Sequence, residues 1–149
     1  MIVRSNPMRT LAAAFALALA GCAIAAGGPQ AAPGSIAGVI NHPAHAVPAM
    51  RICALSTRPG REPHRCIDSR AAADTYRIDG LPPGDYQVFA EVGTGMYRSG
   101  GHVQQVQCIR APCPELPKTV TVTPGALLDG INLTFFDEAR ADFPALPAD

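Results

Sequence analysis

The chain has 149 residues, and its 12 Lys and Arg residues balance its 12 Asp and Glu residues at a formal net charge of zero. Without an excess of positive charge, the chain lacks the electrostatic signature of a nucleic-acid-binding protein. Its length is that of one domain. The 15 prolines and 14 glycines predict many turns, and therefore many short strands between them.

The first residues are typical of an export signal. Arg4 and Arg9 supply positive charge ahead of the apolar run of residues 11–20. That run is about half as long as the ~20 apolar residues that a membrane-spanning helix needs. Residues 1–21 are therefore predicted to be a signal peptide that is removed on export.

The end of this segment resembles the lipobox of bacterial lipoproteins, because Leu19-Ala20-Gly21 leads directly into Cys22. The resemblance implies cleavage before Cys22, attachment of diacylglycerol to its thiol, and acylation of its new amino group by palmitate or a similar chain. Several acyl chains make a lasting anchor, unlike a single one. Because Ala23 follows the cysteine, the Gram-negative sorting rule implies the outer membrane of the cell envelope, facing the periplasm or the cell surface. The alternative is an ordinary secretory signal that is cut after Ala25 or Ala26.

The cysteine count agrees with this assignment. Five cysteines are present, and a lipid on Cys22 leaves four for two disulfides. The local pairing Cys53–Cys66 and Cys108–Cys113 is the simplest of the three connectivities, and it implies an oxidising compartment. A Cys₄ zinc site is the competing interpretation, but only Cys108 and Cys113 approach the usual spacing of zinc ligands. We therefore expect disulfides, no metal and no cofactor.

Residues 22–33 are rich in Gly, Pro and Ala and are predicted to form a tether. Beyond them, period-two alternation between turn residues predicts an all-β sandwich of seven or eight strands, with no helix. The predicted strands cover residues 35–40, 50–55, 66–68, 75–79, 86–92, 119–123 and 131–136, with a weaker candidate at 102–107.

The same alternation predicts which residues face the core. It places Cys53 and Cys66 on the outward face, which predicts a cross-strand disulfide outside the core. The strands at 75–79 and 86–92 are expected to pair as a hairpin.

The segment Tyr76-Arg-Ile-Asp-Gly80-Leu-Pro-Pro-Gly84-Asp-Tyr86-Gln-Val resembles the signature of carboxypeptidase-regulatory-like domains. Pro83 presets a turn and Gly84 permits an unusual backbone angle there. The resemblance extends over residues 34–137 and implies a transthyretin-like (prealbumin-like, Ig-like) sandwich, followed by a tail at 138–149. Such domains are commonly non-catalytic modules, so we expect no enzyme activity.

Four basic residues gather in the segment between Cys53 and Cys66 and are candidates for contact with an anionic envelope component. They are Arg58, Arg61, His64 and Arg65, with only Glu62 opposing them. A solvated, arginine-rich loop without a ligand is the alternative interpretation.

Two further candidates lie in the second half of the chain. Arg110 stands inside the predicted Cys108–Cys113 loop, which loosely resembles a protease-inhibitor loop, although a purely structural disulfide also accounts for it. The alternation places the apolar side chains of Phe89 and Phe136 on the outward faces of their strands. They could form an exposed aromatic strip, or residues 143–146 could fold back and cover them. We favour the second interpretation.

The sequence therefore predicts a non-catalytic envelope lipoprotein that binds or scaffolds an envelope protein or glycan. An exported inhibitor of proteases or wall enzymes is one alternative. A small hydrolase is the other, because Tyr97-Arg98-Ser99-Gly100 superficially resembles a motif of transthyretin-like hydroxyisourate hydrolases, although the residue order differs. His42 and His45 have the spacing of metal ligands, but Pro43 lies between them and favours a solvated loop.

Overall fold

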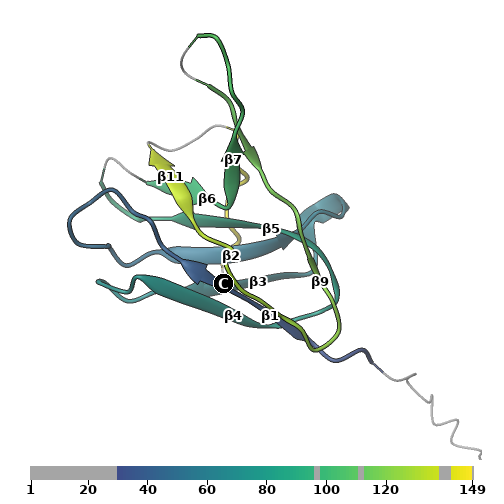
Figure 1. Ribbon diagram of the computed structural model, residues 1–149. Coiled ribbons are helices and arrows are strands. Elements are labelled where there is room, and N and C mark those ends of the chain that lie inside the picture. Colours follow the sequence, from purple (N-terminus) through teal and green to yellow (C-terminus); the bar gives the residue numbers. More distant parts are fainter. Residues whose placement is uncertain (1–29, 96–97, 111–112, 138–141, 149) are drawn as a thin grey trace, which may run out of the picture.

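The computed structural model describes residues 30–95, 98–110, 113–137 and 142–148 (Figure 1). The predicted signal peptide and the predicted lipidation site, Cys22, lie outside these residues. The described chain is all-β, and its one helical element is the 3₁₀ turn Pro59–Arg61. Over the same residues, no helix has the length and apolar character needed to cross a membrane.

Eleven strands form within the described residues, more than the seven or eight predicted. The strands are β1 (Gly34–Val39), β2 (Arg51–Ser56), β3 (His64–Asp68), β4 (Thr75–Leu81), β5 (Gly84–Glu91), β6 (Ser99–Gly101), β7 (Val103–Gln105), β8 (Glu115–Pro117), β9 (Val120–Val122), β10 (Leu127–Leu128) and β11 (Thr134–Asp137). Alternation does not reveal β6, β8 and β10, because strands of two or three residues are too short to show a period.

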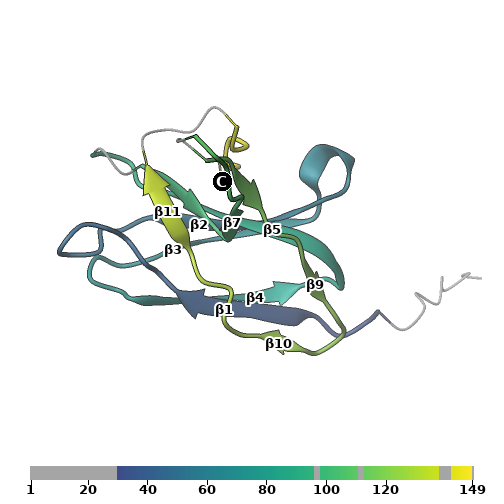
Figure 2. The same ribbon diagram turned by 45° about the horizontal axis from the view of Figure 1, so that its top comes forward.

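The strands form two sheets that face each other, and a separate two-stranded ribbon (Figure 2). The smaller sheet has the order β10-β1-β4, with β10 parallel to β1. The larger sheet has the order β11-β6-β5-β2-β3, and β9 also pairs with β5. The ribbon consists of β7 and β8.

The core lies between the two sheets and contains the side chains that alternation assigns to inward faces. Ile36 and Ile78 come from the smaller sheet, while Ile52, Tyr86 and Val88 come from the larger one. All five are almost completely buried. This arrangement is sandwich-like, with apolar faces turned toward each other.

The predicted hairpin of β4 and β5 is wrong. β4 pairs with β1 in the smaller sheet, whereas β5 pairs with β2, β6 and β9 in the larger one, so the turn between them crosses from one sheet to the other. Pro82 and Pro83 occupy this turn, and proline has no backbone N–H with which to extend a ladder. Leu81 and Tyr86 on either side are both buried in the shared core.

The ribbon of β7 and β8 projects from the sandwich and is here called the arm (Figure 1). In the sequence, the arm is inserted between β6 and β9. Both of these strands pair with β5: β6 pairs with the half of β5 near Glu91, and β9 pairs with the half near Gly84. The arm therefore has its base at the middle of β5. Its tip carries Cys108 and Cys113.

Candidate functional site

Both disulfides have the predicted local pairing. Cys53 and Cys66 lie directly opposite each other in the β2–β3 register, with sulfurs 2.02 Å apart. Cys108 and Cys113 are joined at the tip of the arm, with sulfurs 2.17 Å apart. The first disulfide therefore joins neighbouring strands, and the second closes a short loop.

Cys53 lies on the sheet face that turns away from the main core, as predicted, yet it is completely buried. The tail covers it, because Phe143 and Leu146 pack on a second apolar cluster made of Cys53, Leu55 and Phe89.

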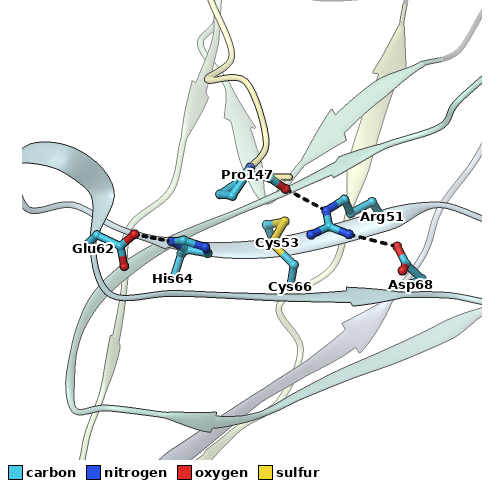
Figure 3. The surroundings of a disulfide bond; sticks show 7 residues. All are labelled: Arg51, Cys53, Glu62, His64, Cys66, Asp68 and Pro147. Carbon is cyan, nitrogen blue, oxygen red and sulfur yellow. Dashed lines mark hydrogen bonds and ion pairs between the residues drawn. A yellow bond between two sulfur atoms is a disulfide. The ribbon is translucent and has the colours of Figure 1, made fainter. Parts of the chain in front are cut away.

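A backbone contact also fixes the tail. Arg51 Nε donates a hydrogen bond to the carbonyl oxygen of Pro147 at 3.0 Å, and an Arg51 terminal nitrogen lies 3.6 Å from Asp68 (Figure 3). Arg51 therefore connects the tail to β2 and β3.

The two aromatic candidates do not form an exposed strip, because both are buried. Phe89 is covered by Phe143, which confirms the tail as the cover at this position. Phe136 belongs to the main core, where its ring lies 4.8 Å from that of His42. The outward assignment of Phe136 is wrong, because the β11–β6 register shifts between Thr134 and Asp137 and interrupts the alternation.

The structure brings the basic candidates together at one end of the sandwich, where β2 ends and β3 begins. The segment is held against the β4–β5 turn, since the Thr57 amide donates to the Asp85 carbonyl at 3.0 Å. Arg61 donates to the side chain of Gln87 at 3.1 Å, and Arg65 donates to the carbonyl of Gly80 at 3.3 Å.

The first described residues of the chain, 30–33, lie at the same end of the sandwich. Gln30 and Ala31 border a concavity of about 770 Å³ together with His64, Arg65 and Pro82. Residues far apart in the sequence, from the tether and from β3, are therefore neighbours here.

The arm tip presents Arg110 to solvent, and among the described residues of the tip the apolar Ile109 is fully exposed as well. Val106 and Leu116 on the two sides of the arm are also exposed. Sequence reasoning missed these three residues, although an isoleucine between two cysteines in a turn-rich segment is a signal that could have been used. Three exposed aliphatic side chains on a projecting ribbon form a surface suited to a protein partner.

Several polar side chains of the described residues make hydrogen bonds that hold the sandwich together. Ser35 donates to Asp79 at 2.6 Å, and this bond, followed by that from Arg77, lowers the pKa of Asp79. Burial raises the pKa of the phenols of Tyr76 and Tyr86, which donate to the carbonyls of Ile131 and Pro82. These phenols are therefore neutral at physiological pH.

Among the described residues, the metal and hydrolase candidates are not assembled into a site. Nδ1 of His42 accepts a hydrogen bond from the Ala44 amide at 3.1 Å, within a bend. Across the described part of the chain, no three His, Cys, Asp or Glu side chains are grouped so as to hold a metal ion. In the candidate hydrolase motif, Tyr97 lies outside the described residues, and Ser99 is part of β6.

These features define an all-β, sandwich-like protein with two disulfides, a docked C-terminal tail and a projecting arm. No protein-family model matches this chain, and no curated protein or solved structure matches it significantly.

Proposed function

We propose that the protein is a lipid-anchored module of the bacterial envelope that binds an envelope protein through its arm. The observation that carries this proposal is the full exposure of Ile109 at the tip of a disulfide-closed ribbon that leaves the sandwich. The apolar surface of an isoleucine stabilises a fold or a complex only when it is removed from water. Burying such a side chain in a partner contributes about 1.5–3 kcal/mol.

The disulfide at the tip favours this role. A loop that is already ordered loses less conformational entropy on binding, so that more of the contact energy appears as affinity. The Cys108–Cys113 bond restricts the loop that carries Ile109 and Arg110. The cross-strand Cys53–Cys66 bond is consistent with an oxidising compartment, where exported lipoproteins fold.

The lipid anchor on Cys22 and membership of the carboxypeptidase-regulatory-like family are also part of the proposal. The lipobox-like Leu19–Cys22 supports lipidation of Cys22. The resemblance of residues 76–88 to carboxypeptidase-regulatory-like domains supports a transthyretin-like topology, and the sandwich-like pairing of the strands is compatible with it. Domains of that class commonly serve as non-catalytic binding modules.

A photocrosslinker at position 109 in the full-length protein, irradiated in intact cells, tests the arm. We expect a specific crosslinked protein that does not form when the crosslinker is placed at Leu127, a half-exposed apolar residue on the sandwich. The purified partner should lose at least about ten-fold in affinity with Ile109→Asp and little with Leu127→Asp. Equal crosslinking at both positions, or equal loss of affinity, would reject the arm as the binding surface.

A separate experiment tests the anchor. Wild-type protein is expected to incorporate labelled palmitate and to fractionate with membranes, whereas Cys22→Ser should do neither. If the Cys22→Ser protein is labelled and fractionates like wild type, the lipoprotein assignment is wrong, irrespective of the result for the arm.

The exposure of Arg110 beside Ile109 favours inhibition of a protease as a second candidate function. Inhibition of trypsin by the purified protein, abolished by Arg110→Ala, would support this candidate. Full trypsin activity with the protein in large molar excess would remove it.

A further inference from the structure

Three arginines lie close together at one end of the sandwich, around the end of β2 and the start of β3. Within the described part of the chain, no ion pair involves Arg58, Arg61 or Arg65. Arg61 and Arg65 donate hydrogen bonds to neutral oxygens, those of the Gln87 side chain and the Gly80 carbonyl. We call the surface formed by Arg58, Arg61 and Arg65 the basic end.

The acidic groups around the basic end are bonded to other residues. Glu62 lies 2.9 Å from Nδ1 of His64, and Asp85 accepts a hydrogen bond from the hydroxyl of Thr121 at 2.6 Å. Asp79 is paired with Arg77 at 2.7 Å. The positive charge of the three arginines is therefore not cancelled by direct contact.

The tether enters the sandwich at this same end. Gln30 and Ala31 share the concavity of about 770 Å³ with Arg65. Gln30 stands eight positions after Cys22 in the sequence. A fully extended chain advances at most about 3.5 Å per residue, so a lipid on Cys22 keeps Gln30 within about 28 Å of the membrane interface.

We propose that the basic end lies against an anionic phospholipid surface and so orients the protein on its membrane. This inference rests on the lipid anchor of the proposed function. Each arginine near a negatively charged leaflet gains about five-fold in binding, and the attraction fades within a Debye length of about 8 Å at physiological salt. The tether keeps the start of the domain within about 28 Å of the leaflet, so that rotation of the domain can carry the basic end into this range, and the attraction then favours that orientation.

The orientation has a consequence for the arm. In Figure 1 the chain that leads into β1 lies at the lower right, while the arm, which contains β7, rises at the top of the molecule. With the basic end against lipid, Ile109 is held clear of the membrane and remains accessible to a protein partner.

Binding of the unlipidated mature chain to vesicles tests the attraction itself. Residues 22–149 with Cys22→Ser are sedimented with phosphatidylcholine vesicles that contain either no phosphatidylglycerol or about one third of it. We expect partition onto the anionic vesicles only, falling about 25-fold in the double variant Arg58→Gln/Arg61→Gln and recovering to wild-type values in Arg58→Lys/Arg61→Lys.

A matched control uses two exposed arginines at the opposite end, Arg70 in the β3–β4 turn and Arg98 before β6. Arg70→Gln/Arg98→Gln removes the same net charge and is expected to lower the partition coefficient less than about two-fold. Equal losses in the two double variants would show that net charge alone drives binding and would overturn the proposal. So would equal partition of the unsubstituted chain onto neutral and anionic vesicles.

The orientation is tested with the lipidated, full-length mature protein in nanodiscs. Amide hydrogen exchange of residues 57–65 is expected to slow when phosphatidylglycerol replaces part of the phosphatidylcholine, and exchange of residues 69–74 is expected to stay unchanged. Protection of both segments, or of neither, would contradict the proposed orientation. If Cys22 takes up no lipid, the proposed function fails, but the vesicle experiment still decides whether the basic end recognises anionic lipid.

Discussion

The ring of Phe143 packs against the ring of Phe89, with their centroids 5.0 Å apart and their planes tilted by 59°. This contact joins the C-terminal tail to the outer face of the larger sheet, and it closes a second apolar cluster over Cys53. Aromatic pairs in tilted geometry add about 0.5–1.5 kcal/mol to the burial of their surfaces. The tail is therefore part of the fold.

Loss of the Phe143 ring is expected to release the tail. We expect Phe143→Ala to lower the free energy of unfolding by about 2 kcal/mol, less than for a fully buried phenylalanine because Phe143 is partly exposed. Urea unfolding measures the change, and Ala145→Ser on the exposed side of the tail is the matched control. Without the tail, dithiothreitol should reduce Cys53–Cys66 faster in the native protein. Unchanged stability and reduction rate would show that the tail does not protect the disulfide.

The two disulfides are expected to differ in their contributions to stability. Replacing both Cys53 and Cys66 by serine should lower the free energy of unfolding by about 3 kcal/mol, because their bond closes a loop between cysteines that are 13 positions apart in the unfolded chain. The same replacement of Cys108 and Cys113 should cost less than about 1 kcal/mol, because Cys108 is exposed, Cys113 is only partly buried, and both lie outside the two apolar clusters. Equal losses in urea unfolding would mean that the arm unfolds together with the sandwich.

Tyr76 is expected to make stability depend on pH in the alkaline range. Burial raises its pKa in the folded state, whereas the unfolded tyrosine titrates near 10. The contribution of Tyr76 is therefore complete below pH ~10 and is lost as the pH rises further, by up to about 1.4 kcal/mol per pH unit.

Tyr76→Phe tests this dependence. The variant also loses the hydrogen bond to the Ile131 carbonyl, which should cost about 1 kcal/mol at pH 7. Urea unfolding between pH 7 and 11 should show a shallower alkaline decline for the variant than for the wild-type protein. Parallel declines would assign the pH dependence to other groups.

Gly38 is expected to tolerate no side chain. A Cβ at this position in β1 would collide with the backbone carbonyl of Ile131, which cannot move aside as a flexible side chain could. Gly38→Ala should therefore cost about 1–3 kcal/mol. Gly93→Ala is the control, because an added Cβ there meets no atom within 4 Å, and it should change the free energy of unfolding by less than about 0.5 kcal/mol. Similar thermal unfolding of both variants would contradict the close approach at Gly38.

Several features of this protein were determined by the sequence alone. Period-two alternation identified the all-β class and the inward residues of β2 and β5, because successive side chains of a strand point to opposite faces. It also placed Cys53 and Cys66 on the same outward face, which is the condition for a bond across neighbouring strands. The apolar residues 143–146, otherwise unexplained in a tail, predicted the cover over Phe89.

Other features were decided only by tertiary structure, because alternation assigns faces to a strand but does not choose its neighbours. The separation of β4 from β5 into different sheets depends on pairing with β1 and β2, which are distant in sequence. The burial of Phe136 depends on a register shift against β6 that no local pattern reveals. The exposure of Ile109 and the meeting of the tether with Arg65 are likewise outcomes of long-range packing. Residue types and their periods are local properties, whereas the surfaces proposed to bind protein and lipid exist only after distant segments have come together.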